Sequence, residues 1–339
     1  LAAEAGVDSW KLRTGKLLRE IDTGGMFKTG HHHRCYRCRA TPRFILAGRR
    51  GTEFIDLQGE NFSMDNWVRG SCRLGFLPAN GLLVATPHPC ACYLSAKITG
   101  FNALAAASGT PQAGKDGDPP PLEHGPAFDT DRRSGSARLS PENWPAHRYD
   151  AARSGASPLP LPAPLAPLWQ TDIGGRLTQP VVGGSVVLAA AVDTSILHAF
   201  DRHTGRPLWR YKAGGRIDSA PSLYGNLVLF GCQDGTLYCL RRRDGALVWR
   251  RRLAPENRLI GDHGQLASAW PVHGAVLVSE GTVYAAAGRA SALDGGIHVW
   301  ALDAADGSVH HHTVLDHTFT DPRKLEENDS STMEGFLAD

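Results

Sequence analysis

The chain has 339 residues, of which 42% are hydrophobic and 21% are charged, and this composition excludes a disordered or fibrous protein. Its 36 basic and 34 acidic residues leave a formal net charge of +2, which is too small to draw the protein onto nucleic acid or an anionic membrane surface. No apolar run approaches the roughly 18 residues needed to cross a bilayer, so we expect no transmembrane segment in this chain.

The N-terminal part, residues 1–104, predicts β-sheets that carry an insert rich in cysteine and histidine. Residues 10–18 contain a Thr-Gly pair between apolar positions, and residues 53–59 show a similar alternation that ends in glycine. Both segments are weak copies of a repeat that is clearer downstream. We therefore expect repeat sheets on both sides of the middle of the chain.

The insert holds five of the seven cysteines, and thiolate and imidazole are ligands that Zn²⁺ and copper prefer. Cys35-x-x-Cys38 has the spacing of a zinc half-site, whereas disulfides in an exported protein are the competing interpretation, which we favour. A redox-active pair would need a βαβ context, which the surrounding sequence lacks. The candidate ligands or disulfide partners are His32, His33, Cys35, Cys38, Cys72, His88, Cys90 and Cys92.

Residues 105–141 are rich in proline and glycine without sustained periodicity, and we interpret them as a linker. An ordered patch is expected at residues 143–155, followed by Trp169. From residue 142 to residue 339 the sequence predicts repeat sheets, with copies near residues 180–210, 220–250 and 270–312.

The repeat is the strongest signal in the sequence. Residues 197–209 match residues 237–249 at an offset of 40, which is the length of a four-stranded propeller blade. A third copy, residues 299–309, lacks the closing tryptophan and has His311 in its place. Each copy has an alternating strand, a Thr-Gly or Asp-Gly turn and a second strand, and such a unit buries both faces only by stacking on further copies.

Charged and polar residues of these copies have structural interpretations. Asp201, Asp234 and Asp306 lie at turns, where aspartate accepts hydrogen bonds from backbone N–H groups. Arginine triplets at 241–243 and 250–252 flank a turn and a strand end, and we expect them to be solvated rather than to form a phosphate site. The histidine triplet 310–312 is expected to be exposed on an edge strand rather than to bind a metal.

Cys232 and Cys239 flank the Asp234-Gly235 turn. If that turn is a two-residue hairpin, Cys232 faces Leu237 and lies diagonal to Cys239, too far for easy bridging. We predict that both are free, buried thiols.

The pattern from Ala199 through Asp201, Thr204 and Gly205 to Trp209 resembles the tryptophan-docking motif of propellers built from PQQ-type repeats. Residues 144–155 are similar to the lead-in of many such bacterial propellers. The resemblance implies an all-β fold, a PQQ-like β-propeller that forms part of a seven- or eight-bladed ring. It also implies that Trp169, Trp209 and Trp249 dock each blade on the next.

The resemblance does not choose an activity, because such repeats serve both quinoprotein dehydrogenases and cofactor-free scaffolds. Quinoprotein dehydrogenases are similar to one another in having a pair of adjacent cysteines over the cofactor, and Cys90-Ala-Cys92 departs from that pattern. We therefore expect a non-catalytic scaffold or binding module of the bacterial cell envelope, periplasmic or secreted, that engages a protein or an envelope polymer and no nucleic acid. The first alternative is a PQQ- and Ca²⁺-dependent alcohol or sugar dehydrogenase, so an enzyme would be a quinoprotein oxidoreductase. The second alternative is a protein that binds Zn²⁺ or copper through the insert.

Overall fold

The computed structural model describes residues 2–3, 6–22, 37–48, 52–59, 62–65, 68, 70–87, 101–106, 121–131, 140–160, 163–291 and 295–316. The chain divides into two compact units. Unit 1 comprises Leu1–Pro111, Gly261–Gln265 and His317–Phe336, and unit 2 comprises Gln112–Ile260, Leu266–Asp316 and Leu337–Asp339. In the described part the secondary structure is strands and one four-residue helix, α1 (Phe128–Asp131).

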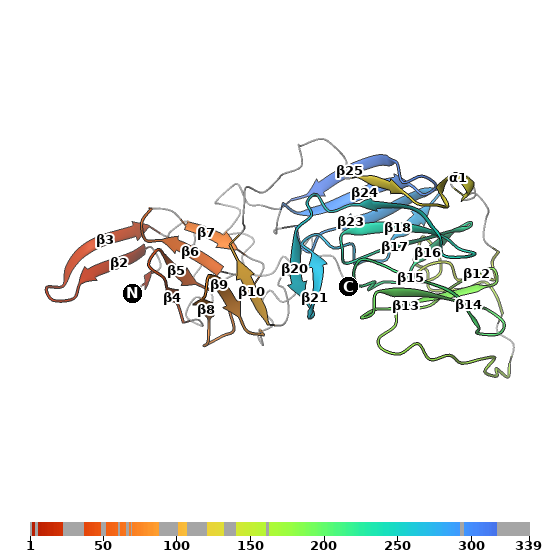
Figure 1. Ribbon diagram of the computed structural model, residues 1–339, viewed down its shortest axis with the longest axis horizontal. Helices are drawn as coiled ribbons and strands as arrows, with labels where there is room; N and C mark the ends of the chain where they lie inside the picture. The colour runs from red at the N-terminus through yellow and green to blue at the C-terminus, as the bar shows by residue number, and fades with distance from the viewer. Residues whose placement is uncertain are drawn as a thin grey trace. The chain divides into compact units, whose positions relative to one another are not determined.

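Unit 1 contains antiparallel sheets of three and four strands (Figure 1). The first, in the order β1-β2-β3, consists of β1 (Ala2–Ala3), β2 (Gly6–Lys11) and β3 (Lys16–Asp22). The second consists of β4 (Arg39–Ala40), β5 (Phe44–Ala47), β6 (Thr52–Asp56) and β7 (Phe62–Asp65). The third consists of β8 (Phe76–Ala79), β9 (Leu82–Ala85) and β10 (Asn102–Ala105). Ile21, Ala47 and Ile55 form a small buried cluster that joins the first two sheets.

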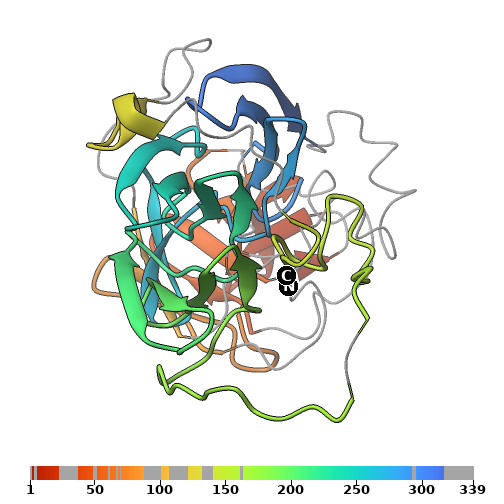
Figure 2. The ribbon, with the colours of Figure 1, turned by 90° about the vertical axis from the view of Figure 1, so that its right-hand side faces the viewer.

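Unit 2 contains three up-and-down antiparallel sheets in chain order, each with four consecutive strands. Figure 2 shows these sheets in succession, from green through teal to blue. The first consists of β12 (Val181–Gly183), β13 (Val186–Ala191), β14 (Ile196–Asp201) and β15 (Pro207–Lys212). The second consists of β16 (Ser222–Tyr224), β17 (Leu227–Gly231), β18 (Thr236–Arg241) and β19 (Leu247–Arg252). The third consists of β22 (Leu277–Ser279), β23 (Thr282–Ala287), β24 (Ile297–Asp303) and β25 (Val309–Leu315). In the chain between the second and third sheets, β20 (Leu259–Asp262) pairs with β21 (Gln265–Ser268), and residues Gly261–Gln265 of this hairpin are assigned to unit 1.

The core of unit 2 lies between neighbouring sheets. All five residues of β17 are buried, because this strand is covered on both faces rather than on one. Leu188, Leu197 and Val228 belong to one cluster that spans the first two sheets. Stacking thus supplies the burial that a single repeat lacks.

A strand that the sequence did not indicate extends the second sheet. β11 (Leu122–His124) lies within the stretch that we interpreted as a linker, and it pairs antiparallel with β19 at the outer edge of that sheet. In the part of the chain that the structure describes, no helix is long and apolar enough to cross a membrane.

Candidate functional site: blade docks, outer edges and a histidine pair

The outer hairpins of unit 2 share one register. Ala199 faces Trp209, Cys239 faces Trp249 and Ala301 faces His311, and each pair is followed by the same shift in pairing. His311 therefore occupies the position of the tryptophans, as the sequence predicted.

Each tryptophan makes a hydrogen bond to a turn of a following sheet: Trp209 and Trp249 join one sheet to the next, and Trp169 joins the segment before the first sheet to that sheet. The indole Nε1 of Trp169 donates to the carbonyl of Arg202 at 2.8 Å, that of Trp209 to Arg242 at 2.9 Å and that of Trp249 to Ala304 at 3.2 Å. The last of these indoles is fully buried.

A glycine in each receiving turn lets the indole approach. Gly205, Gly245 and Gly307 have φ angles of +69°, +71° and +72°, and a Cβ built on them would lie 2.6, 2.5 and 2.9 Å from Trp169, Trp209 and Trp249. Real Cβ atoms do not come so close, so the turn needs glycine for both its left-handed backbone and the ring that covers it.

The turn aspartates are occupied by their own turns. Oδ1 of Asp201 accepts from the backbone N–H groups of His203 and Thr204 and from Oγ1 of Thr204, which together hold the pKa of this carboxyl below its ordinary value. Asp234 accepts from the N–H of Thr236 and Asp306 from that of Ser308, which confirms the structural interpretation of all three.

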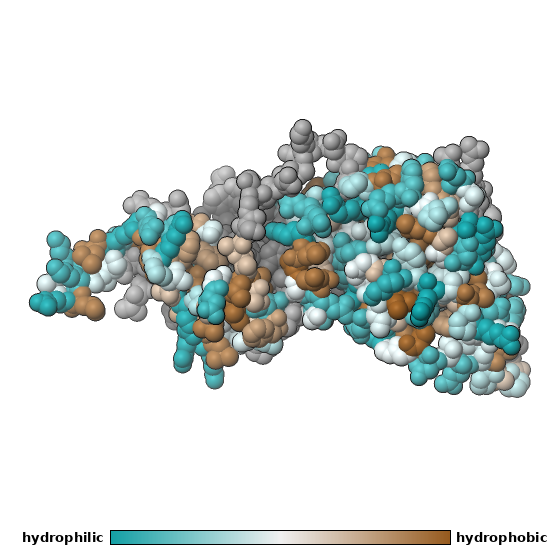
Figure 3. Space-filling view, viewed as in Figure 1, coloured by the Kyte–Doolittle hydropathy of each residue, from teal (hydrophilic) through white to brown (hydrophobic). Residues whose placement is uncertain are grey.

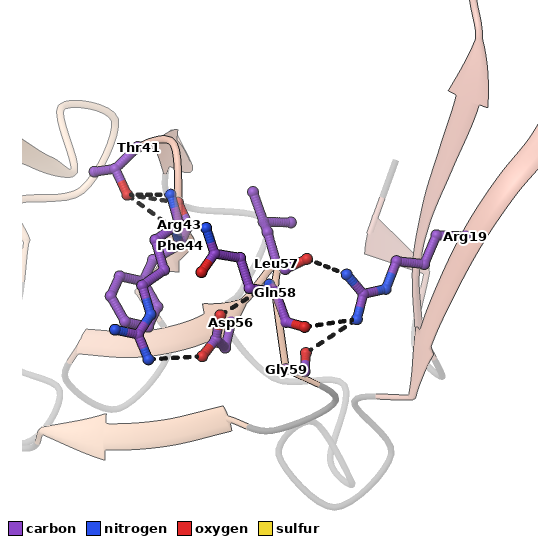
Figure 4. A network of polar contacts seen from close by, with 8 residues as sticks. All are labelled: Arg19, Thr41, Arg43, Phe44, Asp56, Leu57, Gln58 and Gly59. Carbon is purple, nitrogen blue, oxygen red and sulfur yellow. Dashed lines mark hydrogen bonds and ion pairs between the residues drawn. The ribbon is translucent and has the colours of Figure 1, made fainter.

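In unit 1 an arginine takes the place of a docking tryptophan. Ser9 faces Arg19 and the register shifts immediately after this pair, as it does beside Trp209. The guanidinium of Arg19 donates to the carbonyls of Leu57, Gln58 and Gly59 (Figure 4). These bonds hold the turn that follows β6. Arg19 binds the carbonyl of Leu57, the residue after Asp56, just as Trp169 binds the carbonyl of Arg202, the residue after Asp201.

One of the arginines expected to be solvated, Arg251, is buried instead, so that prediction was wrong for it, and Arg241 is half-buried in an ion pair. Arg251 is only 6% exposed, and its Nε donates to the carbonyl of Gly307 at 2.8 Å. Arg241 forms a two-point ion pair with Asp244, through Nε–Oδ1 at 2.8 Å and Nη2–Oδ2 at 2.6 Å. Their guanidinium groups hold turns together because these turns offer carbonyl and carboxylate acceptors at the strand ends.

An ion pair of a buried arginine with a half-buried aspartate fixes the loop between β15 and β16. Arg216, 6% exposed, binds Oδ1 of Asp218 through Nη2 at 2.5 Å, and Gln233 donates its amide to the other carboxylate oxygen. The N–H of Gln233 in turn binds the carbonyl of Arg216 at 2.9 Å. The loop and the β17–β18 turn therefore form one hydrogen-bonded unit.

The outer edge of β19 is covered by the chain itself. Glu123 faces Arg250 and binds it at 2.6 Å, and beyond the strand the N–H of Gly125 bonds to the carbonyl of Val248 at 2.8 Å. The side chain of Leu122 lies beside Gly307: a Cβ built on Gly307 would be 2.9 Å from the Leu122 side chain. An extended segment is thus held by backbone pairing, an ion pair and one apolar contact.

Most of the predicted cysteine and histidine site lies outside the described residues, namely His32, His33, Cys35, His88, Cys90 and Cys92. Cys38 is exposed and Cys72 half-buried, and both thiols are free, so the expected disulfides do not form at these two residues. Among the residues that the structure describes, no group of three or more His, Cys, Asp or Glu side chains is placed to hold a metal ion.

Cys232 and Cys239 are free and buried, as predicted, and burial raises the pKa of both thiols. The predicted register was wrong by one residue. Leu237 faces Gly231 rather than Cys232, because the N–H of Cys232 bonds to the carbonyl of Thr236 around a longer turn.

The histidines 310–312 are exposed on β25, as expected. His312 nevertheless has close neighbours that the sequence did not indicate: its ring stacks on Trp300 with centroids 3.7 Å apart, and its Nε2 lies 3.1 Å from Nδ1 of His298. Burial, followed by the nearby His312, lowers the pKa of His298 to about 4. Burial and His311 lower that of His312, so both rings are uncharged at neutral pH.

Comparison with known proteins decides what these sheets are. Residues 166–269, which include all three docking tryptophans and the first two sheets of unit 2, match the family described as outer membrane protein assembly factor BamB. The chain carries PQQ-like β-propeller repeats. Its four-stranded sheets are therefore propeller blades, and the tryptophan contacts are the docks between them.

The relatives of these blades include both enzymes and an assembly factor. Quinoprotein alcohol dehydrogenase PedH of Pseudomonas putida is 33% identical over 104 residues, which cover 26% of this chain and 17% of that protein. Outer membrane protein assembly factor BamB of Xanthomonas campestris is 27% identical over 136 residues, or 34% of this chain and 33% of that protein. The crystal structure of quinohemoprotein alcohol dehydrogenase from Comamonas testosteroni superposes with a TM-score of 0.41 at 24% identity, over 54% of this chain and 28% of that one. The chain thus spans a third or less of the length of these relatives.

Proposed function

We propose that the chain is a non-catalytic binding module, a propeller scaffold of the bacterial cell envelope whose outer blade edges bind extended segments of a partner protein. The observation that carries this proposal is β11, which adds as a fifth strand to the outer edge of β19. An edge that binds an extended segment in cis has the geometry to bind one in trans.

The edges of β15 and β25 offer the same surface. Each is the last strand of its sheet within the described residues, and six of the seven residues of β25 are exposed. An edge strand presents a row of unpaired N–H and C=O groups, which is a template for another strand. On the face shown in Figure 3, apolar side chains of unit 2 lie in small groups among polar ones, which suits backbone pairing better than a broad apolar interface.

The relatives support an envelope setting. BamB is by name a factor in outer membrane protein assembly, and the repeats of this chain match its family. A periplasmic or secreted location and a protein partner follow as part of the proposal, with an envelope polymer as the second class of partner.

The second candidate function is a PQQ- and Ca²⁺-dependent alcohol dehydrogenase, favoured by the similarity to PedH. The described residues do not fit a Ca²⁺ site, which requires six to eight oxygen ligands. The carboxylates of Asp201, Asp234 and Asp306 already accept hydrogen bonds from their own turns, and no larger acidic group gathers in the described part of the chain. We therefore derive no catalytic step through the cofactor.

Site-specific photo-crosslinking in the native host tests the binding proposal. A photoreactive residue at Thr313 on β25 should give one discrete protein adduct, whereas the same residue at Tyr284, which is 44% exposed on the inner strand β23, should give none.

An edge-blocking variant makes the test specific for strand addition. The β18–β19 and β24–β25 hairpins share one register, in which Val314 corresponds to Arg252. The backbone groups of Val248 point to the outer edge of β19, and every second residue along the strand points the same way, so the N–H of Arg252 does too. The N–H of Val314 therefore points to the outer edge of β25. Val314→Pro removes that donor and should abolish the adduct, while Val314→Ala should retain it. Equal labelling from Tyr284, or an adduct that survives Val314→Pro, would overturn the proposal.

A further inference from the structure

The histidine pair on the last blade is placed as two ligands of a metal ion. His298 on β24 faces Val314, and Trp300 faces His312, so His298 and His312 lie diagonally on the same face of two adjacent strands. Trp300 is only 3% exposed and stacks on the His312 ring with an interplanar angle of 18°, which holds the orientation of that imidazole.

The separation of the two nitrogens matches that of neighbouring ligands on one ion. Nδ1 of His298 and Nε2 of His312 are 3.1 Å apart. With Zn–N bonds of about 2.0–2.1 Å, two imidazole nitrogens stand about 3 Å apart at a right angle and about 3.4 Å apart at the tetrahedral angle.

We propose that His298 and His312 form a two-histidine site for a late first-row divalent cation, Zn²⁺ or Cu²⁺. Imidazole suits both ions, and the exposure of His312 leaves the remaining coordination positions open to water. In the metal-free pair one ring donates its N–H to the other. Binding moves that proton to the second nitrogen of the same ring. Because the two rings are nearly parallel, with centroids 5.2 Å apart, their nitrogens face each other, and the His298 ring must turn for both lone pairs to point at one ion.

This site is distinct from the cysteine and histidine insert predicted in residues 30–93, and it does not rest on the proposed edge-binding function. Among the described residues, no third His, Cys, Asp or Glu side chain joins the pair in a metal-binding group. The site needs only the β24–β25 pairing and Trp300.

Carbethoxylation of histidine by diethyl pyrocarbonate, read by peptide mass spectrometry on the full chain, tests the proposal residue by residue. Zn²⁺ or Cu²⁺ at ten times its Kd should slow labelling of His312 roughly tenfold, since only the metal-free fraction reacts. His311, exposed on the same strand but facing the opposite side, is the matched control and should label at an unchanged rate. The labelling of His312 is measured on a different peptide from that of the insert histidines, so metal bound to the insert does not change the measured rate.

Variants separate a shared site from binding to one exposed imidazole. His298→Ala should make the labelling of His312 insensitive to metal, whereas His311→Ala should preserve protection; far-ultraviolet circular dichroism checks that both variants fold. Protection at lower Cu²⁺ than Zn²⁺ concentration would follow the general affinity order, and protection by either ion supports the site. The proposal is overturned if neither ion protects His312 more than His311, or if protection survives His298→Ala.

Discussion

Gly245→Ala should destabilise the protein far more than the same change at another left-handed glycine. Gly245 has φ +71° and a Cβ there would lie 2.5 Å from the Trp209 ring, whereas Gly174 has φ +68° with no atom within 4 Å of its Cβ position. Both glycines belong to unit 2. The two substitutions therefore share the backbone strain and differ in the dock.

The magnitudes follow from these contacts. A left-handed alanine costs about 1–2 kcal/mol, which is the whole effect expected for Gly174→Ala. Gly245→Ala adds overpacking of about 1–3 kcal/mol against Trp209, so we expect a total of about 2–5 kcal/mol. Removing the ring should relieve the clash, and the double variant Gly245→Ala, Trp209→Ala should cost less than the sum of the single changes.

Guanidinium titration followed by far-ultraviolet circular dichroism measures these costs from midpoints at unchanged slope. If Gly245→Ala and Gly174→Ala agree within about 0.5 kcal/mol, or if the double variant is simply additive, the indole does not dock on this turn as described.

Further predictions concern Arg19, a turn and a thiol. Arg19→Ala should speed amide hydrogen exchange in β2 and β3 roughly ten- to a hundredfold, matching about 1.5–3 kcal/mol of charged hydrogen bonding, while Arg13→Ala, exposed in the same hairpin, should leave exchange unchanged. The pKa of Asp201 is lower in the folded protein than in the unfolded chain. The ionised carboxyl therefore stabilises the fold at pH values above the unfolded pKa, and this stabilisation is lost as the pH falls through the folded pKa. Thr204→Ala should raise the pKa of Asp201 in an NMR titration, and an unchanged pKa would refute the role of the Thr204 hydroxyl. Cys239, buried and with a raised pKa, should resist alkylation at pH 8 in the native protein and react once denaturant is added; rapid native labelling would contradict its burial.

The repeated motif predicted the sheets of unit 2 and the position of His311 in place of tryptophan, because glycine stands four residues before the docking position in every copy. The same spacing from Gly15 leads to Arg19, which a pattern that requires an aromatic residue at the docking position does not predict. A guanidinium satisfies the same carbonyls as an indole N–H, so composition alone conceals the equivalence.

Other features depend on contacts between distant parts of the chain. β11 is too short to show periodicity, and its pairing with β19 joins Glu123 to Arg250 across 127 residues. Arg251 looks like a solvated charge until the carbonyl of Gly307 is placed beside it. His298 and His312 meet only through the register of β24 and β25.

The central claim, that these PQQ-like blades serve as a binding module rather than as an enzyme, is tested most directly by calorimetric titration of the full-length protein with PQQ. We expect no saturable binding of PQQ, with or without Ca²⁺. Saturable binding that requires Ca²⁺ would contradict it and establish the dehydrogenase as the better interpretation.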